Sequence, residues 1–497
     1  MEAWTSTSAA RLLMSRILNC SSGERLLEVV KHHAAFFNHV HVPAALGRLA
    51  KHQPLARWRD DARTHLLVAR AGELLGEMDA RGLSYTAWAC SKLGVTPEWL
   101  PVWIGLTTDL MATMDAFGLS NSVYALASLG HHPGNAWFGS FYAASLDMST
   151  FKEQTFSNIL YSLALLGDVP NVDWWDAFWA ASSEDIESFS PQGLSNIIWA
   201  AATLHVSPPD GWLTRFFSAS KESTTRFNAR DYSQIIWALA VLRHRPSDAW
   251  LQLLIHTSFN QLRGFSGQEL HNTLWGLAEL AFVPGPDWFA AWSTRVVAII
   301  DTLSSQNAVN SLWALTVFQM QNSGIFRFLF LQALRILTPD SDVKHLTCFY
   351  DVIQMAAGKV EGLPTPNTSL MEAAQKMHSL QLASTALHRA SFNHRAVLAV
   401  LTELGIPHQQ EHICPHAGRN IDIALLDRRV AVEVDGPSHF LSLGEYLFCQ
   451  TGSTLLRNLM LTHAGWKVIT IPFFEWNWLT TMDTQKEYFQ RKLYSAA

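Results

Sequence analysis

Hydrophobic residues in the first two thirds of the chain recur at the spacing of amphipathic helices. In residues 151–184, for example, Phe156, Ile159, Leu160 and Leu163 lie at positions i, i+3, i+4 and i+7, which places them on one helical face. A glycine and a proline then end this helix, and an aromatic-rich segment begins a second one. The pattern therefore predicts two helices joined by a short turn.

This helix–turn–helix pattern repeats with a period close to 38 residues. One aromatic series marks the first helix of each copy: Trp88, Tyr124, Tyr161, Trp199, Trp237, Trp275 and Trp313. A second series marks the second helix: Trp99, Trp137, Trp174, Trp212, Trp250 and Trp288. A fixed period of this length predicts an α-solenoid of helix–turn–helix repeats, in which stacked copies bury each other's apolar faces.

Polar residues occupy two fixed positions of each predicted first helix, four residues apart, and the aromatic marker follows three residues later. At 100° per residue the three positions share the face opposite the apolar stripe. The outer position holds Gln154, Gln192, Arg230, Gln268 and Gln306, and the inner position holds Asn121, Asn158, Asn196, Gln234, Asn272 and Asn310.

The outer and inner polar positions together form a polar row along the repeats, and two interpretations of this row compete. In a groove, the amides would bond base edges and the aromatic rings would stack on bases. At a repeat boundary, the amides would satisfy helix ends and the rings would pack neighbouring copies. A residue type that is nearly constant from copy to copy discriminates little between bases, so the pattern favours packing and capping, with variable neighbours reading the bases.

The periodicity stops near residue 340. Residues 341–393, which include the loop-like sequence GKVEGLPTPNTS, are predicted as a helical linker. Residues 394–497 change to short alternating strands and single helices, which predicts a small α/β domain.

Strand alternation places the acidic residues of this domain. Glu433 and Asp435 share the polar side of one strand, and an adjacent strand could bring Asp422 beside Glu433. Such a carboxylate pair suits Mg²⁺, and His439 and Arg457 could lie close by. Alternatively, the sequence after Val434 is a turn and the acidic residues are solvated strand ends, which the motif geometry alone favours.

Charge and composition narrow the classes of function. The chain is 48% hydrophobic and 16% charged with a net charge of −6, and residues 81–340 alone carry −7. A nucleic-acid-binding protein usually has a basic face, because phosphate neutralisation supplies much of its affinity, so this balance weighs against simple RNA binding. The basic residues of the array cluster at Arg215, Lys221, Arg226, Arg230, Arg243 and Arg245.

Three further features of the sequence bear on the cellular compartment of the protein. The five cysteines show no ligand spacing, which predicts a reduced intracellular setting without structural zinc, and no apolar run is long enough to span a membrane. Residues 1–30 contain arginine and serine but few acids, which predicts an organelle transit peptide, with a first solenoid helix as the alternative. The solenoid itself is predicted over residues 31–340.

The C-terminal segments IDIALLDRRVAVEVDGPSHF and LRNLMLTHAGWKVITIPFFEW resemble a RAP domain, a domain named for its abundance in apicomplexan RNA-binding proteins. The repeats, with their P-P-x-x-W turn and N-x-x-W helix, resemble octotricopeptide repeats of green-algal organelle proteins. This order of domains is also similar to that of FAST-kinase-like mitochondrial RNA factors.

The resemblance implies an imported chloroplast or mitochondrial factor that binds single-stranded RNA, about one nucleotide per repeat, and acts in RNA stability, processing, splicing or translation. Other organellar RNA-processing proteins would be further partners. On this basis the candidate RNA-binding residues are the polar row from Gln154 to Asn310 together with Arg243 and Arg245.

RAP domains are similar in fold to restriction-endonuclease-like PD-(D/E)XK and very-short-patch-repair nucleases. By that resemblance Asp422 and Glu433 are the candidate metal ligands and catalytic acids, Asp435 replaces the motif lysine, and His439 matches the patch-repair histidine. Because a carboxylate cannot supply the charge of a lysine, we expect a domain that does not cleave and requires no cofactor. The alternatives are a Mg²⁺-dependent endoribonuclease and a solenoid scaffold for a protein partner.

Overall fold

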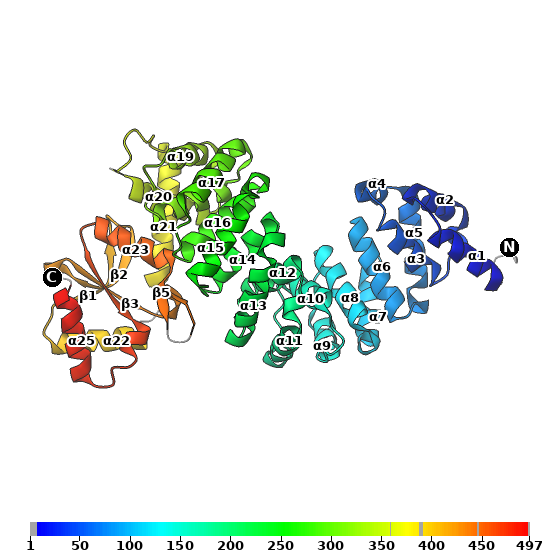
Figure 1. Cartoon of the computed structure of the whole chain (residues 1–497), viewed down its shortest axis with the longest axis horizontal. Helices are drawn as coiled ribbons and strands as arrows, with labels where there is room; N and C mark the ends of the chain where they lie inside the picture. Colours follow the sequence, from blue (N-terminus) through cyan, green and yellow to red (C-terminus); the bar gives the residue numbers. More distant parts are fainter. Residues whose placement is uncertain (1–6, 358, 387–390, 445–446, 496–497) are drawn as a thin grey trace. The chain divides into compact units, whose positions relative to one another are not determined.

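The computed structural model describes residues 7–357, 359–386, 391–444 and 447–495 (Figure 1). The chain divides into two compact units, Met1–Ser220 and Lys221–Ala497. The first unit contains helical repeats, and the second contains further repeats and a small strand-containing domain. The predicted fold class, an α-solenoid followed by a small α/β domain, is confirmed.

Each repeat consists of a first and a second helix. The first helices are α3 (His41–Leu49), α6 (Ala80–Leu93), α8 (Ala116–Ser128), α10 (Glu153–Leu166), α12 (Pro191–Thr203), α14 (Ala229–Val241), α16 (Gly267–Glu279) and α18 (Ser305–Val317). The second helices are α5 (Ala62–Leu74), α7 (Leu100–Leu110), α9 (Asn135–Ala144), α11 (Val172–Glu184), α13 (Asp210–Ser223), α15 (Asp248–Phe259), α17 (Pro286–Ala298) and α19 (Gly324–Ile336). The short helix α4 (Leu55–Arg59) lies between α3 and α5.

Local sequence signals define where the first helices begin. Ser190 is the N-cap of α12 and accepts a hydrogen bond from the amide of Gly193, and Pro191 follows at the first helical position. Asn228, Ser266 and Ser304 begin the next three first helices with reciprocal capping boxes. Within each compact unit, the first helices contact one another more extensively than the second helices do. The first helices therefore line the inner side of each array.

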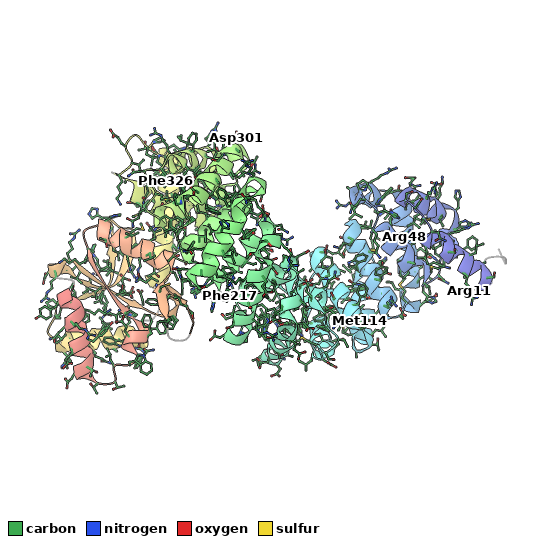
Figure 2. The ribbon with its side chains drawn as sticks, viewed as in Figure 1. Arg11, Arg48, Met114, Phe217, Asp301 and Phe326 are labelled. Carbon is green, nitrogen blue, oxygen red and sulfur yellow. The ribbon has the colours of Figure 1, made fainter. Side chains whose placement is uncertain are left out.

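The second aromatic series joins each repeat to the one before it. In four copies the indole N–H donates a hydrogen bond to a buried hydroxyl about 30 residues earlier, on or just after the preceding second helix, whereas Trp99 donates to the Val68 carbonyl at 2.8 Å. The donor–acceptor pairs are Trp137–Thr107 (3.0 Å), Trp174–Ser145 (2.9 Å), Trp212–Ser182 (3.0 Å) and Trp288–Ser258 (3.0 Å). These tryptophans are buried, so this series is structural. Within the second helix α19, Phe326, labelled in Figure 2, is fully buried and stacks on Phe330.

Two helices occupy the range predicted as a transit peptide. They are α1 (Thr7–Leu18) and α2 (Gly23–His33); the first six residues of that range lie outside the described ones. Leu13 and Ile17 of α1 are buried, and its Ala10 carbonyl lies 2.9 Å from Nε2 of His41 at the start of α3. The described residues therefore pack as a further repeat, which agrees with the alternative interpretation of this range. Targeting stays a prediction.

The range predicted as a linker holds α20 (Val343–Ala356) and α21 (Thr368–Ala386), while residues 358 and 387–390 lie outside the described ones. Helix α20 packs on α18, and α21 packs on α20. Buried Asp351 of α20 accepts from Nη2 of Arg419 at 2.6 Å and lies 3.2 Å from Nε2 of His378. This charged contact ties the two helices to the C-terminal domain.

The C-terminal domain is built on a four-stranded sheet of order β1-β2-β3-β6, in which only β3 and β6 are parallel. Its elements are α22 (Phe392–Glu403), β1 (Gln409–Cys414), β2 (Arg419–Leu425), β3 (Val430–Asp435), the hairpin β4 (Phe440–Ser442) and β5 (Phe448–Gln450), α23 (Gly452–His463), β6 (Lys467–Pro472), α24 (Phe473–Trp476) and α25 (Met482–Ser495). Helices α22 and α25 cover one sheet face and share its apolar core, and α23 lies on the other (Figure 1).

This domain docks on the last repeats within the second compact unit. The backbone of Ser442 in β4 exchanges hydrogen bonds of 2.8 Å with Arg243 and Arg245. Glu279 of α16 accepts from the amide and the hydroxyl of Ser453 in the first turn of α23, both at 2.9 Å. A carboxylate at a helix N-terminus is favourable, so Glu279 anchors α23 on the array. Among the described helices, none is both long and apolar enough to cross a membrane.

Candidate functional site

The polar row lies along the inner first helices of both units. Its outer residues are exposed and its inner residues are buried or half-buried. Three inner amides are more than nine-tenths buried, with exposed fractions of 5% for Asn121, 6% for Asn196 and 8% for Gln234. Each has a buried atom with no hydrogen-bond partner in the described part of the chain, namely Asn121 Nδ2, Asn196 Oδ1 and Gln234 Oε1. Such an atom costs about 1–3 kcal/mol when it is left unpaired, so the row carries unused bonding capacity.

The aromatic markers of the first helices contact each other between repeats. The ring centroids of Tyr161 and Trp199 are 5.1 Å apart, and those of Trp275 and Trp313 are 6.3 Å apart. These are ordinary separations for packed aromatic pairs, so no base lies between the rings. Packing is therefore one role of this series, and a base would stack only on the exposed part of a ring.

The predicted basic cluster is only partly free to meet a ligand. Arg215 pairs with Glu187 at 2.8 Å. Arg245 is largely buried: its Nε donates to the Leu280 carbonyl at 2.9 Å, and its Nη2 lies 2.7 Å from Asp248. Arg230 and Arg243 are exposed. The side chain of Arg245 is therefore engaged within the repeats, while its backbone N–H donates to Ser442 of β4.

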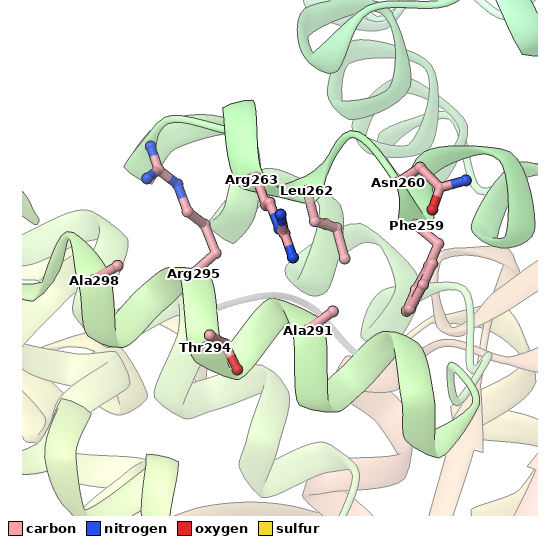
Figure 3. A pocket seen from close by; sticks show the side chains of 8 residues that line it. All are labelled: Phe259, Asn260, Leu262, Arg263, Ala291, Thr294, Arg295 and Ala298. Atoms are coloured by element: carbon pink, nitrogen blue, oxygen red, sulfur yellow. The ribbon is translucent and has the colours of Figure 1, made fainter.

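A pocket of about 650 Å³ lies on the second-helix layer, away from the polar row. It is formed by the end of α15, the 3₁₀ turn η7 (Leu262–Gly264) and α17. Figure 3 shows Arg263 pointing from η7 toward α17 and Arg295 pointing from α17 back toward the turn. Nε of Arg295 donates to the Phe265 carbonyl at 2.9 Å, so Arg295 holds the turn against α17.

The predicted carboxylates meet where strands β2 and β3 separate. The last backbone pair joins Ile423 to Val432, and continuing the register by one residue sets Asp422 opposite Glu433. Here the amide of Val434 donates to Oδ2 of Asp422 at 2.7 Å instead of to the neighbouring backbone. The Asp422 side chain thus takes the place of a backbone hydrogen bond between β2 and β3, and its carboxylate lies where the pairing of the two strands stops.

Arg457 of α23 lies among these acids. It donates to both carboxylate oxygens of Asp435, at 2.8 and 3.0 Å, and lies 3.2 Å from Oε2 of Glu433. His439, on the 3₁₀ turn η10 (Pro437–His439), has its Nδ1 3.4 Å from both Arg457 and Asp435. The structure therefore brings all four predicted catalytic residues together. The guanidinium supplies, from another element, the positive charge that Asp435 cannot.

Burial dominates the electrostatics of this carboxylate cluster. Desolvation raises the pKa of Glu433 to about 8; Arg457 opposes this shift, while Asp422 and Asp435 add to it. Desolvation also raises the pKa of Asp422 and lowers that of His439. Although burial alone would lower it, the pKa of Arg457 is raised by Glu433 and Asp435. Glu433 is therefore mainly protonated at neutral pH, which makes it a poor anionic ligand there.

Two residues near Asp422 were not predicted from the sequence. His394 in the first turn of α22 and Glu411 of β1 offer ligand atoms that lie, with one from Asp422, within 4.8 Å of one another. Glu411 lies 11 positions before Asp422 and faces it only because β1 and β2 are antiparallel. His394 comes from a helix, and no sequence spacing indicates that its first turn reaches the sheet.

Comparisons with known proteins find similarities in two parts of the chain. Residues 432–492, which contain most of β3, Arg457 and the strand β6, match the family described as RAP domain. The C-terminal domain is a RAP domain. The repeats at residues 183–339 are similar to the family described as Tbc2 translation factor, N-terminal domain. A RAP domain-containing protein, chloroplastic, of Oryza sativa subsp. japonica is 34% identical over 76 residues. That match spans 15% of this chain and 11% of the rice protein.

Proposed function

We propose that this protein is an organellar RNA-binding factor of post-transcriptional RNA metabolism. The inner first helices hold a short single-stranded RNA, and the RAP domain, docked on the last repeats, contacts the same transcript or a partner protein. The chloroplast is the favoured organelle because the relative in rice is named chloroplastic. Translation is the favoured process because the repeats are similar to a translation factor domain.

The observation that carries this proposal is the unpaired amide atoms of the polar row. Asn121, Asn196 and Gln234 occur at the same position of different repeats, and each keeps a buried polar atom that no described residue bonds and that a side-chain rotation would bring to a base. A residue that served only packing would be satisfied by its own fold. Base edges supply the donors and acceptors that amides bond in single-stranded RNA recognition.

The low positive charge of the array shapes the expected binding. Residues 81–340 carry a net charge of −7, and Arg215 and Arg245 are held in ion pairs. Few cations are therefore available to release counterions from phosphates. We expect affinity that depends strongly on RNA sequence and only moderately on salt concentration.

Near-isosteric replacements test the role of the amides. Asn196→Leu and Gln234→Met remove the unpaired atoms, and Gln252→Met on the exposed side of α15 is the matched control. If the amides bond bases, each row variant should weaken binding to the natural RNA by about 1 kcal/mol or more and keep or raise its melting temperature. The control should change neither quantity.

The opposite pattern would contradict the proposal. If both row variants lose stability while RNA affinity is unchanged, the amides serve repeat packing. The RNA itself is identified by crosslinking the tagged protein in its organelle. If its complexes there survive RNase and contain no enriched transcript, the array is a protein scaffold.

A further inference from the structure

Three elements of the RAP domain converge at the open end of its sheet. His394 comes from the first turn of α22, Glu411 from the edge strand β1 and Asp422 from β2. One ligand atom of each lies within 4.8 Å of the other two, and His394 Nδ1 is 3.9 Å from Oε1 of Glu411. Donor atoms around an ion at about 2.1 Å are roughly 3–4 Å apart, so small side-chain rotations bring all three onto one ion.

His394 is a buried polar side chain that the fold leaves unsatisfied. Its exposed fraction is 5%, and within the described part of the chain its Nε2 has no hydrogen-bond partner. Its Nδ1 faces Glu411 at a distance longer than a hydrogen bond. A buried imidazole usually bonds through both nitrogens or binds a metal, so His394 keeps bonding capacity that the described residues do not use.

Both carboxylates are oriented by second partners, as metal ligands usually are. The amide of Asn420 donates to Oε2 of Glu411, and the backbone N–H of Val434 donates to Oδ2 of Asp422. Each carboxylate thus keeps one oxygen that these bonds do not use. The two residues lie directly across from each other, because the neighbouring pairs join Gln410 to Ile423 and His412 to Ile421.

We propose that His394, Glu411 and Asp422 bind one divalent transition-metal ion. One imidazole and two carboxylates suit Zn²⁺ or Mn²⁺, whereas sites for Mg²⁺ and Ca²⁺ are built from oxygen ligands alone. The ion fixes the start of α22 to β1 and β2. Glu411 is partly exposed, so the ion can exchange with solvent.

This site differs from the pair of metal ligands predicted from the sequence. Asp422 belongs to both sets, but Asp435 is already ion-paired with Arg457, which also lies 3.2 Å from Glu433. A second cation beside that guanidinium would be repelled. Glu411 approaches Asp422 from β1, on the side of β2 away from β3, and His394 approaches from α22. The two carboxylates leave a negative charge there that a cation would compensate.

Metal titration of the full-length protein tests the site. The protein is first stripped of metal with EDTA, and the EDTA is then removed. Zn²⁺ and Mn²⁺ are titrated by calorimetry, and the visible absorption of bound Co²⁺ reports nitrogen and oxygen ligation. We expect one equivalent, with Zn²⁺ tighter than Mn²⁺, and a rise in melting temperature. His394→Gln and Glu411→Gln should each weaken binding at least about tenfold. His416→Gln, an exposed histidine of the same domain, should not.

Each other outcome overturns the proposal. Absence of a stoichiometric site would show that the cluster is a set of uncoordinated side chains. Equal binding by wild type and all three variants would show adventitious binding by surface histidines. Because Glu411 is partly exposed, Glu411→Gln gives the decisive comparison if His394→Gln fails to fold. A site that binds Mg²⁺ as tightly as Zn²⁺ would contradict the assigned ligand chemistry.

Discussion

Replacing Glu433 by glutamine isolates the cost of a buried carboxylate at the centre of the RAP domain. Glu433 is 2% exposed, and its Oε1 has no hydrogen-bond partner among the described residues. Burial raises its pKa from the ordinary 4.5 to about 8. Glutamine has the same shape and mimics the protonated acid, so the variant removes the titration and keeps the packing.

The sign of the effect follows from proton linkage. Between pH 4.5 and 8 the folded protein holds a proton on Glu433 that the unfolded chain has released. Stability from this group is therefore complete at low pH and falls as pH rises through that window. Between pH 5 and pH 7.5 the wild type should lose about 2–3 kcal/mol that Glu433→Gln does not lose.

Hydrogen exchange of the amides of β3 measures this difference locally, since a long repeat protein does not unfold in one step. In EDTA-containing buffer, wild type and Glu433→Gln should show equal protection at pH 5 after correction for intrinsic rates. At pH 7.5 the variant should be more protected, by roughly 30- to 100-fold. Exposed Glu487→Gln is the control. Equal protection at both pH values, or weaker protection of the variant at pH 7.5, would refute the assignment of a raised pKa.

The remaining predictions concern the array, the docking contact and cleavage. Ser182→Ala leaves the indole N–H of Trp212 unpaired and should cost about 1–3 kcal/mol of local stability by hydrogen exchange, whereas exposed Ser218→Ala should cost little; equal effects would mean that the bond is not stabilising. Glu279→Ala removes the anchor of α23 and should increase proteolysis of the RAP domain in the intact protein, and unchanged digestion would show that the remaining contacts suffice. Purified protein with Mg²⁺ or Mn²⁺ should leave end-labelled bound RNA intact, because Glu433 is mainly protonated at neutral pH and Asp435 is paired with Arg457; cleavage that disappears in the Asp422→Ala, Glu433→Ala double variant would make the RAP domain an endoribonuclease.

Local patterns in the sequence were sufficient to predict the repeats. The helical spacing around Phe156 and the N-caps at Ser190 and Ser266 depend only on residues within one or two helical turns. Such local features can be recognised in the sequence without knowledge of the fold. The hydroxyl partners of the tryptophans were missed because Ser182 and Trp212 are 30 residues apart. A buried serine on an apolar face carries no signal until the stacking of repeats is known.

In the candidate site of the RAP domain, too, local features were predicted and long-range contacts were missed. Strand alternation was sufficient to put Glu433 and Asp435 on one side and to predict that an adjacent strand could bring Asp422 beside Glu433. The approach of His394 to Asp422 could not be predicted, because it depends on where α22 crosses the end of the sheet. The engagement of the Arg245 side chain was also missed, because its partner, the Leu280 carbonyl, lies 35 residues away in the next repeat.

Ultraviolet crosslinking of the tagged protein inside its organelle, with mass-spectrometric mapping of the crosslinked residues, tests directly whether the inner first helices bind RNA. We expect a few enriched organellar transcripts and crosslinks on the inner first helices, near the polar row and its aromatic markers. No enriched transcript, or crosslinks confined to the second-helix layer around Arg263 and Arg295, would contradict it.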